Sequence, residues 1–538
     1  MGTQLLAAPA AALAGSGPAA VLAGPVPLAA PALKLPSIDY AAITPMLVLF
    51  GAACLGVLVE AFAPRPMRYR LQVPLTLAGL VAGLVVIIAV AGRRLTTAGD
   101  AIAVDGPALF LQGSVIVLGI VAVLLIAERS LERGGAFVSR ASVTAGTPAD
   151  RAQAEEPGAT EVYPLVLFAL GGMMLFVSAN DLLTLFVALE VFSLPLYLLC
   201  GLARRRRLLS QEAAVKYFLL GAFSSAFFLY GVALLYGYAG SVQLAGLRQA
   251  VEAGKGNSTL LTLGLAMLAV GLLFKAAAVP FHVWTPDVYQ GAPTPITALM
   301  AACTKVAAFG ALLRVFTVGF PLGTFDWRPV LIVIAIATMM IGAILAVTQT
   351  DIKRLLAYSS IANAGYVLTG VLALSKDGVA GTMFYLVAYG FAVLAAFGVI
   401  TLVRDADGEA THLARWAGLG RRSPLFAALF TFLMLAFAGI PLTSGFTSKF
   451  AVFSAALDAH QVLLVIVGVL SSAIIAFPYL RVVVLMYLSE PAEDTPTVSV
   501  PGALTAASLA IGVLATALLG VLPSSVLALA LRAAGFVS

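Results

Sequence analysis

The chain has 538 residues, of which 61% are hydrophobic and 10% are charged, and its mean hydropathy is +1.04. This composition excludes a soluble globular protein and predicts an all-α polytopic membrane protein, because a helix of about 20 apolar residues spans the hydrocarbon layer. The net charge of +6 does not indicate binding to nucleic acid, since the basic residues stand in short loops without interleaved aromatic residues.

The sequence offers no recognisable pattern for a cofactor or a metal ion. Cys54, Cys200 and Cys303 lie in separate apolar segments without a CxxC motif, which favours small buried side chains over disulfides or iron–sulfur ligands. A glycine-rich nucleotide motif, a Walker loop and a histidine pair suited to haem are all missing. We therefore expect that this chain neither binds a nucleotide nor carries electrons.

The first segment, residues 1–40, is expected to be a flexible extension. Residues 1–36 are rich in Ala, Pro and Gly, carry Lys34 as their only charge, and lack the basic start of a signal peptide. A weak interfacial segment is the alternative.

Hydrophobic runs after this extension predict about fourteen membrane helices. The runs cover residues 44–63, 72–92, 107–126, 162–179, 181–200, 214–240, 259–281, 293–318, 329–348, 354–375, 380–403, 424–458, 461–488 and 501–530. We group them as helices 1–3 over residues 41–126, a first repeat over 161–320, a second repeat over 321–490 and a last helix over 491–538. The intervening residues 127–160 are rich in Arg, Glu, Ala, Ser and Gly, and are expected to form a disordered cytoplasmic loop.

The basic residues predict the orientation. If the first loop is cytoplasmic, 17 of the 31 Lys and Arg residues fall on the cytoplasmic side, 8 fall on the other side and 6 lie within helices. The positive-inside rule then places both termini outside the cytoplasm. Arg314 is one of the residues within helices, and we expect its long stem to reach the interface.

Glu190 is a carboxylate in the middle of the predicted helix 181–200. Burial favours the neutral form of a carboxyl group and of a lysine, whereas a nearby opposite charge favours the charged forms. A Glu–Lys pair whose distance changes would therefore switch its affinity for protons. The alternative is a static ion pair that holds helices in register.

The stretch 271–310 places two lysines, a histidine and four prolines in apolar surroundings. Pro280 interrupts its helix and frees backbone carbonyls, which need polar partners inside a membrane. Lys275 and Lys305 flank this break. Because a lysine is costly in the bilayer, we expect both to face the bundle interior or a hydrated cavity.

A second break carries Pro441, 161 residues after the first. The broken helices are the seventh and the twelfth, so their units cross the membrane in opposite directions, which is the inverted-repeat architecture of ion transporters. Lys449 follows this break. Four hydroxyl side chains could satisfy the freed backbone groups, namely Thr443, Ser444, Thr447 and Ser448.

Two further residues have competing interpretations. Lys216 stands four residues after Glu212 near a cytoplasmic helix end, where an ordinary surface pair competes with a role in a channel. His282 directly follows Pro280 and could relay protons, or it could merely cap the freed carbonyls.

Four segments resemble the antiporter-like membrane subunits of respiratory complex I. They are VKYFLLGAFSSAFFLYG from Val215, PFHVWTPDVYQGAPTPITA from Pro280, DIKRLLAYSSIANAGY from Asp351 and AGIPLTSGFTSKF from Ala438. The resemblance covers roughly residues 40–530 and is closest to the subunit N branch of NADH-quinone oxidoreductase. It implies a fourteen-helix fold with discontinuous helices 7 and 12, and a proton path through Glu190, Lys275, Lys305 and Lys449.

The resemblance also implies a setting. The chain would be one proton-translocating subunit in the bacterial plasma membrane, beside the antiporter-like subunit M and small subunits such as K, J and A. NADH, FMN, iron–sulfur clusters and quinone would belong to partner subunits. The alternatives are a subunit of a multisubunit cation/proton antiporter or membrane-bound hydrogenase, and a structural scaffold subunit.

Three features distinguish the chain within this family. Lysine rather than glutamate at Lys449 is unlike subunit M, and the chain ends soon after the predicted last helix, without the long lateral helix expected of subunit L. Asn363 stands where many relatives have a histidine. Asparagine cannot titrate, so a relay at this point would use water or another group.

Overall fold

The computed structural model describes residues 37–537, apart from 133, 141, 145, 154, 155, 255, 321–326, 406, 407 and 492–495. Most of the extension expected over 1–40 therefore lies outside the described residues. The rest forms one compact unit of helices with short connections.

The first half of the described chain supplies six long helices before the first break. They are α1 (Tyr40–Phe62), α2 (Arg65–Ala89), α3 (Gly106–Ile126), α5 (Val162–Ser178), α6 (Leu182–Cys200) and α7 (Arg207–Ala239). The next span is divided into α9 (Ser258–Ala276) and α10 (Trp284–Gly291). After it, α11 (Thr294–Leu299), the π-helical segment η2 (Met300–Thr304), α12 (Lys305–Arg314) and the π-helical segment η3 (Val315–Gly319) form one continuous rod.

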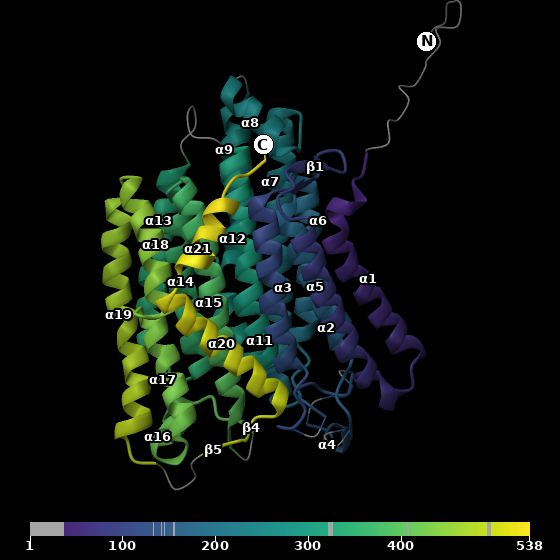
Figure 1. Cartoon of the computed structure of the whole chain (residues 1–538), viewed down its shortest axis with the longest axis vertical. Coiled ribbons are helices and arrows are strands. Elements are labelled where there is room, and N and C mark those ends of the chain that lie inside the picture. The colour runs from purple at the N-terminus through teal and green to yellow at the C-terminus, as the bar shows by residue number, and fades with distance from the viewer. Residues whose placement is uncertain are drawn as a thin grey trace, which may run out of the picture. The chain divides into compact units, whose positions relative to one another are not determined.

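The second half repeats the pattern of long helices with one divided span. It contains α13 (Arg328–Val347), α14 (Ile352–Leu372), α15 (Lys376–Leu402), α17 (Pro424–Ala438), α18 (Ser444–Asp458), α19 (Val462–Leu488), α20 (Ala503–Val521) and α21 (Ser524–Ala533). Figure 1 shows these helices side by side, with α20 and α21 crossing in front of the bundle.

Short elements lie at the helix ends. They are α4 (Pro148–Ala152), α8 (Leu244–Ala253), η4 (Leu413–Trp416), α16 (Leu419–Arg422), the hairpin β1 (Leu95–Thr97) and β2 (Ile102–Val104), and the antiparallel sheet β4 (Gly408–Glu409), β3 (Val403–Asp405) and β5 (Thr497–Val498).

The prediction of an all-α polytopic membrane protein is confirmed. The described residues contain 12 helices that are long and apolar enough to cross a membrane. Three apolar helices among the described residues fall short of a full span, α5 with 17 residues, α17 with 15 residues and α21 with 10 residues. The count of about fourteen crossings and the inverted relation of the two repeats stay predictions.

Two helix starts differ from the predicted ones. α2 begins at Arg65 rather than at residue 72, and α7 begins at Arg207 rather than at residue 214. Both helices start with polar turns that extend beyond the apolar run, so a search for hydrophobic stretches misses them.

The centre of the bundle is formed by the rod Thr294–Gly319 together with α14 and α15. In the apolar span of the rod, 100% of the residues are buried, and in those of α14 and α15 the share is 94% each. The corresponding share is only 33% to 39% in α1, α2, α19 and α20. Polar residues on the central helices are therefore shielded from lipid, which is the condition for placing charge inside a membrane.

Two arginines, Arg204 and Arg207, bind the described part of the loop 127–160, whose expected disorder stays a prediction. Arg204 donates hydrogen bonds to carbonyl oxygens of this loop, at 3.0 Å to Gly135, 3.1 Å to Phe137 and 3.0 Å to Glu156. Arg207 adds an ion pair with Asp150 at 2.5 Å. One arginine thus satisfies several backbone carbonyls and holds the described part of the loop against the bundle.

The expectation that Arg314 reaches the interface is wrong. Its guanidinium is fully buried and donates to both carboxylate oxygens of Asp105, at 3.0 and 2.7 Å. The same carboxylate accepts a hydrogen bond from the backbone N–H of Val537 at 3.0 Å, which ties the C-terminal segment to the start of α3. Burial alone would raise the pKa of Asp105, but the Arg314 guanidinium and these hydrogen bonds hold it below its usual range.

Candidate functional site

The first helix break lies between α9 and α10, where Pro280 was expected to interrupt the span. α9 ends at Ala276, and Ala277 adopts the left-handed conformation with φ of 59°. The carbonyl of Phe274 accepts hydrogen bonds from the backbone N–H of Ala277 and from the indole N–H of Trp284, both at 3.1 Å. The N–H of Val279 donates to the hydroxyl of Thr338 at 3.0 Å. Polar side chains of two other helices, α10 and α13, therefore satisfy backbone groups at the break.

Lys275 lies one residue before this end of α9 and is only 3% exposed. Its ammonium is surrounded by aromatic rings, with centroid distances of 5.3 Å to Phe192, 5.1 Å to Tyr197, 5.0 Å to Tyr217 and 5.7 Å to Phe274. The hydroxyl of Tyr197 is 3.4 Å from its Nζ atom. Ring faces attract a cation without neutralising it, so this cage holds an ammonium group in a dry site.

Glu190 and Lys275 are close enough for electrostatic attraction. They do not form a direct ion pair, because none of the ion pairs within 4.0 Å among the described residues joins them. The Oε1 atom of Glu190 is buried without a hydrogen-bond partner. Glu190 and Lys275 are thus electrostatic neighbours without a direct ion pair, and their role as a switching pair stays a prediction.

Lys305 caps the broken helix from a neighbouring span. It is 3% exposed, and its Nζ atom donates to the carbonyl oxygen of Ala276 at 3.2 Å and to that of Ser360 at 2.8 Å. Carbonyls at a helix C-terminus carry the negative end of the helix dipole and favour a cation. Lys305 therefore faces the bundle interior, as its insertion cost predicts.

The second break has the same chemistry. α17 ends at Ala438, and Gly439 follows with φ of 88°. Lys449, which is 6% exposed, donates to the carbonyl oxygens of Phe437 and Ala438, both at 3.0 Å, and to the hydroxyl of Ser472 at 2.7 Å. Its ammonium also lies 5.0 Å from the centroid of the Tyr366 ring.

The hydroxyl groups expected to satisfy this break contribute less than the lysine does. Thr443 donates to the carbonyl of Ile440 at 2.7 Å, within the break. Thr447 and Ser448 bond carbonyls of their own helix region. The last two carbonyls of α17 are bound by the Lys449 ammonium, whose long stem reaches back across the break, and that of Ala438 also accepts from the Ser472 hydroxyl at 3.4 Å.

A chain of polar side chains on α14 and α15 lies between these lysines. Asn363 accepts a hydrogen bond from the hydroxyl of Tyr385 at 2.6 Å and donates to the carbonyl of Ser359 at 2.8 Å. The Ser359 and Tyr479 hydroxyls are 2.5 Å apart. The sequence singled out Asn363 but not Ser359, Tyr385 or Tyr479. A single hydroxyl residue in an apolar helix belongs to no motif that would mark it as functional.

A small cavity of about 10 Å³ joins the second lysine to this chain. Its lining includes Lys449, Asn363 and Tyr385, together with Tyr389 and Ser448. That volume is close to the roughly 10–15 Å³ needed to hold one water molecule, and the lining offers several polar partners.

Lys216 and His282 lie at the margin of this arrangement. Lys216 is 2.7 Å from Glu212, as the surface interpretation predicts, and also 2.7 Å from Asp287, which in turn pairs with Arg354 at 2.7 Å. This network ties α7, α10 and α14 together. His282 is partly buried near the Pro280 carbonyl, and its Nδ1 atom has no hydrogen-bond partner.

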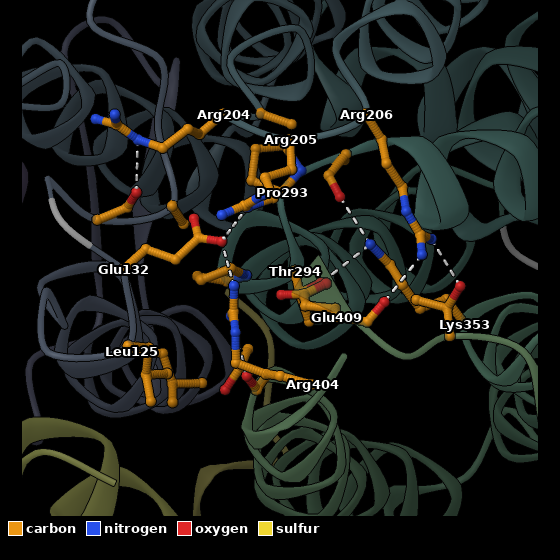
Figure 2. A pocket seen from close by; sticks show the side chains of 18 of the residues that line it. Leu125, Glu132, Arg204, Arg205, Arg206, Pro293, Thr294, Lys353, Arg404 and Glu409 are labelled. Carbon is orange, nitrogen blue, oxygen red and sulfur yellow. Dashed lines mark hydrogen bonds and ion pairs between the residues drawn. The ribbon is translucent and has the colours of Figure 1, made fainter. Parts of the chain in front are cut away.

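A polar cavity of about 80 Å³ lies at the loop between α10 and α11. Figure 2 shows Lys353, Thr294 and Glu409 close together there, with Glu132 between Arg205 and Arg404. Lys353 is 2% exposed and donates to the carbonyl of Ala292 at 2.8 Å and to the Thr294 hydroxyl at 3.1 Å. Lys353 stands just before the apolar run 354–375, so the sequence did not predict its burial.

Comparisons with known proteins agree with this geometry. Residues 179–475 match the family described as NADH:quinone oxidoreductase/Mrp antiporter, TM. A protein of Salinispora arenicola named NADH-quinone oxidoreductase subunit N is 67% identical over 94% of this chain and 99% of its own length. A protein of Rhodococcus opacus with the same name is 59% identical over 93% of this chain and 97% of its own length.

Two solved structures have the same fold. A chain of respiratory complex I from Thermus thermophilus is 35% identical, covers 91% of this chain and 100% of its own length, and superposes with a TM-score of 0.74. A chain of the Mrp complex from Dietzia, 24% identical, covers 92% of this chain and 97% of its own length with a TM-score of 0.77, and supports the fold alone. On these findings, the chain belongs to the NADH-quinone oxidoreductase subunit N family.

Proposed function

We propose that this chain translocates protons, without redox chemistry of its own, as a membrane subunit of a bacterial NADH:quinone oxidoreductase. One observation carries the proposal. The ammonium groups of Lys305 and Lys449 each bind carbonyl oxygens at the end of a broken membrane helix. A structural cap needs no titratable group, whereas a lysine bound this way couples its protonation to the geometry of the break.

The physical basis is differential stabilisation of the ammonium. While the helix end points at the lysine, its carbonyls and the helix dipole stabilise the charged form. If the two halves of the broken helix shift, the ammonium loses these partners in a low-dielectric interior, and releasing its proton becomes favourable. Each break thus acts as a site whose proton affinity follows a conformational change.

The Glu190 and Lys275 groups fit the first step of such a sequence. When they approach, the carboxylate stabilises the ammonium in its aromatic cage. When they separate, the ammonium is left with only aromatic rings and one hydroxyl, and its proton can move on toward Lys305. We assign the proton path to Glu190, Lys275, Lys305 and Lys449, with Lys216 and His282 as lesser candidates.

Between Lys305 and Lys449, the proton would pass the Asn363 region. The amide of Asn363 cannot titrate, but the Tyr385 hydroxyl and a water molecule in the adjoining cavity can both accept and donate hydrogen bonds. We therefore assign the relay at this point to Tyr385 and water rather than to the residue at 363.

The proposal includes the setting of the chain. We place it in the bacterial plasma membrane with both termini on the non-cytoplasmic side, next to subunit M and small subunits such as K, J and A. NADH, FMN, iron–sulfur clusters and quinone are assigned to partner subunits. A multisubunit cation/proton antiporter is the second candidate, favoured by the shared fold of the Mrp chain. Co-purification with flavin and iron–sulfur subunits would separate the two.

The decisive experiment replaces Lys275 with alanine and measures NADH-driven proton uptake in inverted membrane vesicles. We expect Lys275→Ala to lower pumping by about tenfold or more, as for loss of a proton-transfer group, while the complex still assembles. Lys376→Ala, an exposed lysine at the start of α15, serves as the control and should pump normally. Full pumping by the assembled Lys275→Ala complex would exclude this residue from the path, and the scaffold interpretation would gain.

A further inference from the structure

A large apolar groove lies on the outside of the bundle, away from the lysine chain. It has a volume of about 540 Å³ and runs between α2, α3 and α21, with Val387 of α15 at its floor. This volume falls within the range of roughly 300–1,000 Å³ that is typical of pockets for small molecules. In Figure 1, α21 lies on the front of the bundle, to the left of α3.

The walls of the groove are hydrocarbon. Leu109, Phe110 and Val117 of α3 form one side, and Leu529 of α21 lies on the other. Among the lining residues, Ser114 alone has a hydroxyl side chain. This hydroxyl donates a hydrogen bond to the Phe110 carbonyl of its own helix at 2.7 Å. The groove also opens sideways, since Ile88 is 68% exposed and Leu529 is 52% exposed. An occupant must therefore be apolar along most of its length.

One end of the groove is positively charged. Arg93 and Arg94 follow the end of α2, and Arg532 stands in the last turn of α21, so all three lie where α3 begins. The turn that carries Arg93 and Arg94 also lies beside the C-terminal segment, because Arg94 donates to the carbonyl of Gly535. The charges are thus gathered at the level of a membrane interface.

These arginines are poorly neutralised within the chain. The Nη1 atom of Arg93 is 3.4 Å from the Oδ2 atom of Asp39, and the two side chains are 42% and 39% exposed. Arg94 donates to the carbonyl oxygens of Gly535 and Phe536 at 3.2 and 3.4 Å, and Arg532 donates to its own helix at Ala528 at 3.4 Å. Among the residues that the structure describes, these three guanidinium groups thus share one carboxylate, in contrast to the fully paired Arg314.

We propose that this groove binds an anionic phospholipid, with an acyl chain between α3 and α21 and the phosphate on Arg93, Arg94 and Arg532. Guanidinium groups match phosphate geometry by donating paired hydrogen bonds, and basic clusters at a membrane surface select anionic headgroups. The apolar walls account for the acyl chain. The proposal concerns a lipid site on the outer face of the bundle and does not depend on the proton path.

The test uses the assembled complex that contains this chain, purified in mild detergent. It is incubated with phosphatidylglycerol that carries a photoreactive diazirine on one acyl chain, irradiated, and analysed by peptide mass spectrometry. We expect labelled peptides from α3 and α21. Phosphatidylcholine with the same acyl probe should label them more weakly, by about fivefold or more, because it lacks the net negative charge that an interfacial arginine attracts.

Two variants separate the contributions of charge and space. Arg93→Gln/Arg94→Gln/Arg532→Gln should reduce phosphatidylglycerol labelling to the phosphatidylcholine level. The control Arg421→Gln/Arg422→Gln removes two exposed arginines on α16 and should change nothing. Gly113→Leu keeps the arginines but fills the groove, because a Cβ atom at Gly113 would meet only Ile87, at 4.0 Å. We expect it to abolish labelling by both lipids.

Several results would overturn the proposal. Equal labelling by the two lipids, or undiminished labelling in the triple arginine variant, would exclude a role for the charges. Undiminished labelling in Gly113→Leu would exclude the groove as the acyl site. Cross-links from the groove to a neighbouring subunit in place of the probe would identify the face as a protein interface.

Discussion

The ammonium of Lys305 on α12 lies 3.2 Å from the carbonyl oxygen of Ala276, the last residue of α9. The lysine and the helix end that it caps thus come from different membrane spans. At the second break, Lys449 performs the same task from the half-helix that directly follows. At both breaks, a lysine therefore binds carbonyls at the end of the interrupted helix. This lysine comes from another membrane span at the first break and from the following half-helix at the second.

The cap and the proton carrier can be separated at Lys449. Lys449→Arg retains donors for the carbonyls of Phe437 and Ala438 but cannot release its proton, whereas Lys449→Met loses both properties. We expect the arginine variant to assemble like the wild type and to lose pumping by about tenfold or more. The methionine variant should in addition lose about 1–3 kcal/mol of stability, because carbonyls are left without a partner.

Thermal unfolding of the purified complex, followed by size-exclusion chromatography, measures the stability of these variants, and proton uptake in inverted vesicles measures pumping. An arginine variant that pumps normally would mean that Lys449 acts only as a cap.

Glu190→Gln tests the electrostatic partner of Lys275. Glutamine keeps the shape but removes the charge that attracts the ammonium, so the charged form of Lys275 becomes less available. A membrane potential of 100 mV is worth about 2.3 kcal/mol per charge, which is comparable to a shift of about one to two pKa units. We therefore expect loss of this one interaction to stall proton transfer against the potential. We expect glutamine to suppress NADH-driven pumping strongly, and Glu190→Asp to be milder.

Both Glu190 variants should be compared at equal assembly. If the glutamine variant pumps like the wild type, the proton-affinity switch is excluded. Reduced assembly in both variants, with unchanged activity of the assembled fraction, would support a static structural role.

Tyr385→Phe tests the relay near Asn363. The change removes the hydroxyl that donates to Asn363 at 2.6 Å and preserves the aromatic ring. One hydrogen bond of this kind is worth about 1 kcal/mol, so we expect pumping to slow by about fivefold. Tyr163→Phe is the matched control, because Tyr163 is also buried but does not line the cavity beside Lys449. Equal rates in the two variants would place the relay elsewhere.

Lys216→Gln should have a small effect. The side chain is 43% exposed, and its pairs with Glu212 and Asp287 are of the surface type, each worth about 0–1 kcal/mol. Arg354 remains as a partner for Asp287. We expect pumping within about twofold of the wild type and slightly smaller sensitivity to salt, because the pairs that salt screens are gone. A loss of pumping as large as that expected for Lys275→Ala would bring Lys216 into the path.

Asp105→Asn should destabilise the bundle through its buried pair with Arg314. Removing one partner of such a pair typically costs about 3–5 kcal/mol, because the other charge stays buried. The folded pKa of Asp105 is lowered, so its contribution is fully present above the ordinary value of about 3.9 and is lost only as the pH falls through the folded pKa. The difference in melting temperature between wild type and variant should therefore be constant from pH 5 to pH 8.

Differential scanning fluorimetry of the solubilised complex at several pH values provides this measurement. A difference that grows between pH 7 and pH 5 would show that the folded pKa of this carboxylate is raised rather than lowered, because the folded state would then bind the proton more tightly than the unfolded state. Accessibility of the C-terminal segment to a carboxypeptidase should rise in the variant, because Val537 loses its acceptor.

Local chemistry in the sequence predicted the membrane fold, most helix positions and both breaks. A long apolar run predicts a membrane helix, and Pro280 and Pro441 mark the two breaks, although other prolines are accommodated inside α1, α2, α6 and α19. The insertion cost of a lysine likewise predicted that Lys275, Lys305 and Lys449 are buried, since lipid excludes a charge regardless of its neighbours.

Only the tertiary structure decided which groups the buried charges meet. Lys305 reaches Ala276 and Ser360, which are 29 and 55 residues away along the chain. Arg314 meets Asp105, 209 residues away, instead of reaching the interface. Such partners depend on which helix faces pack together, and packing depends on the combined shape of many side chains. An apolar helix buried on all sides carries no stripe that reveals its neighbours, so these contacts have no signature in the local sequence.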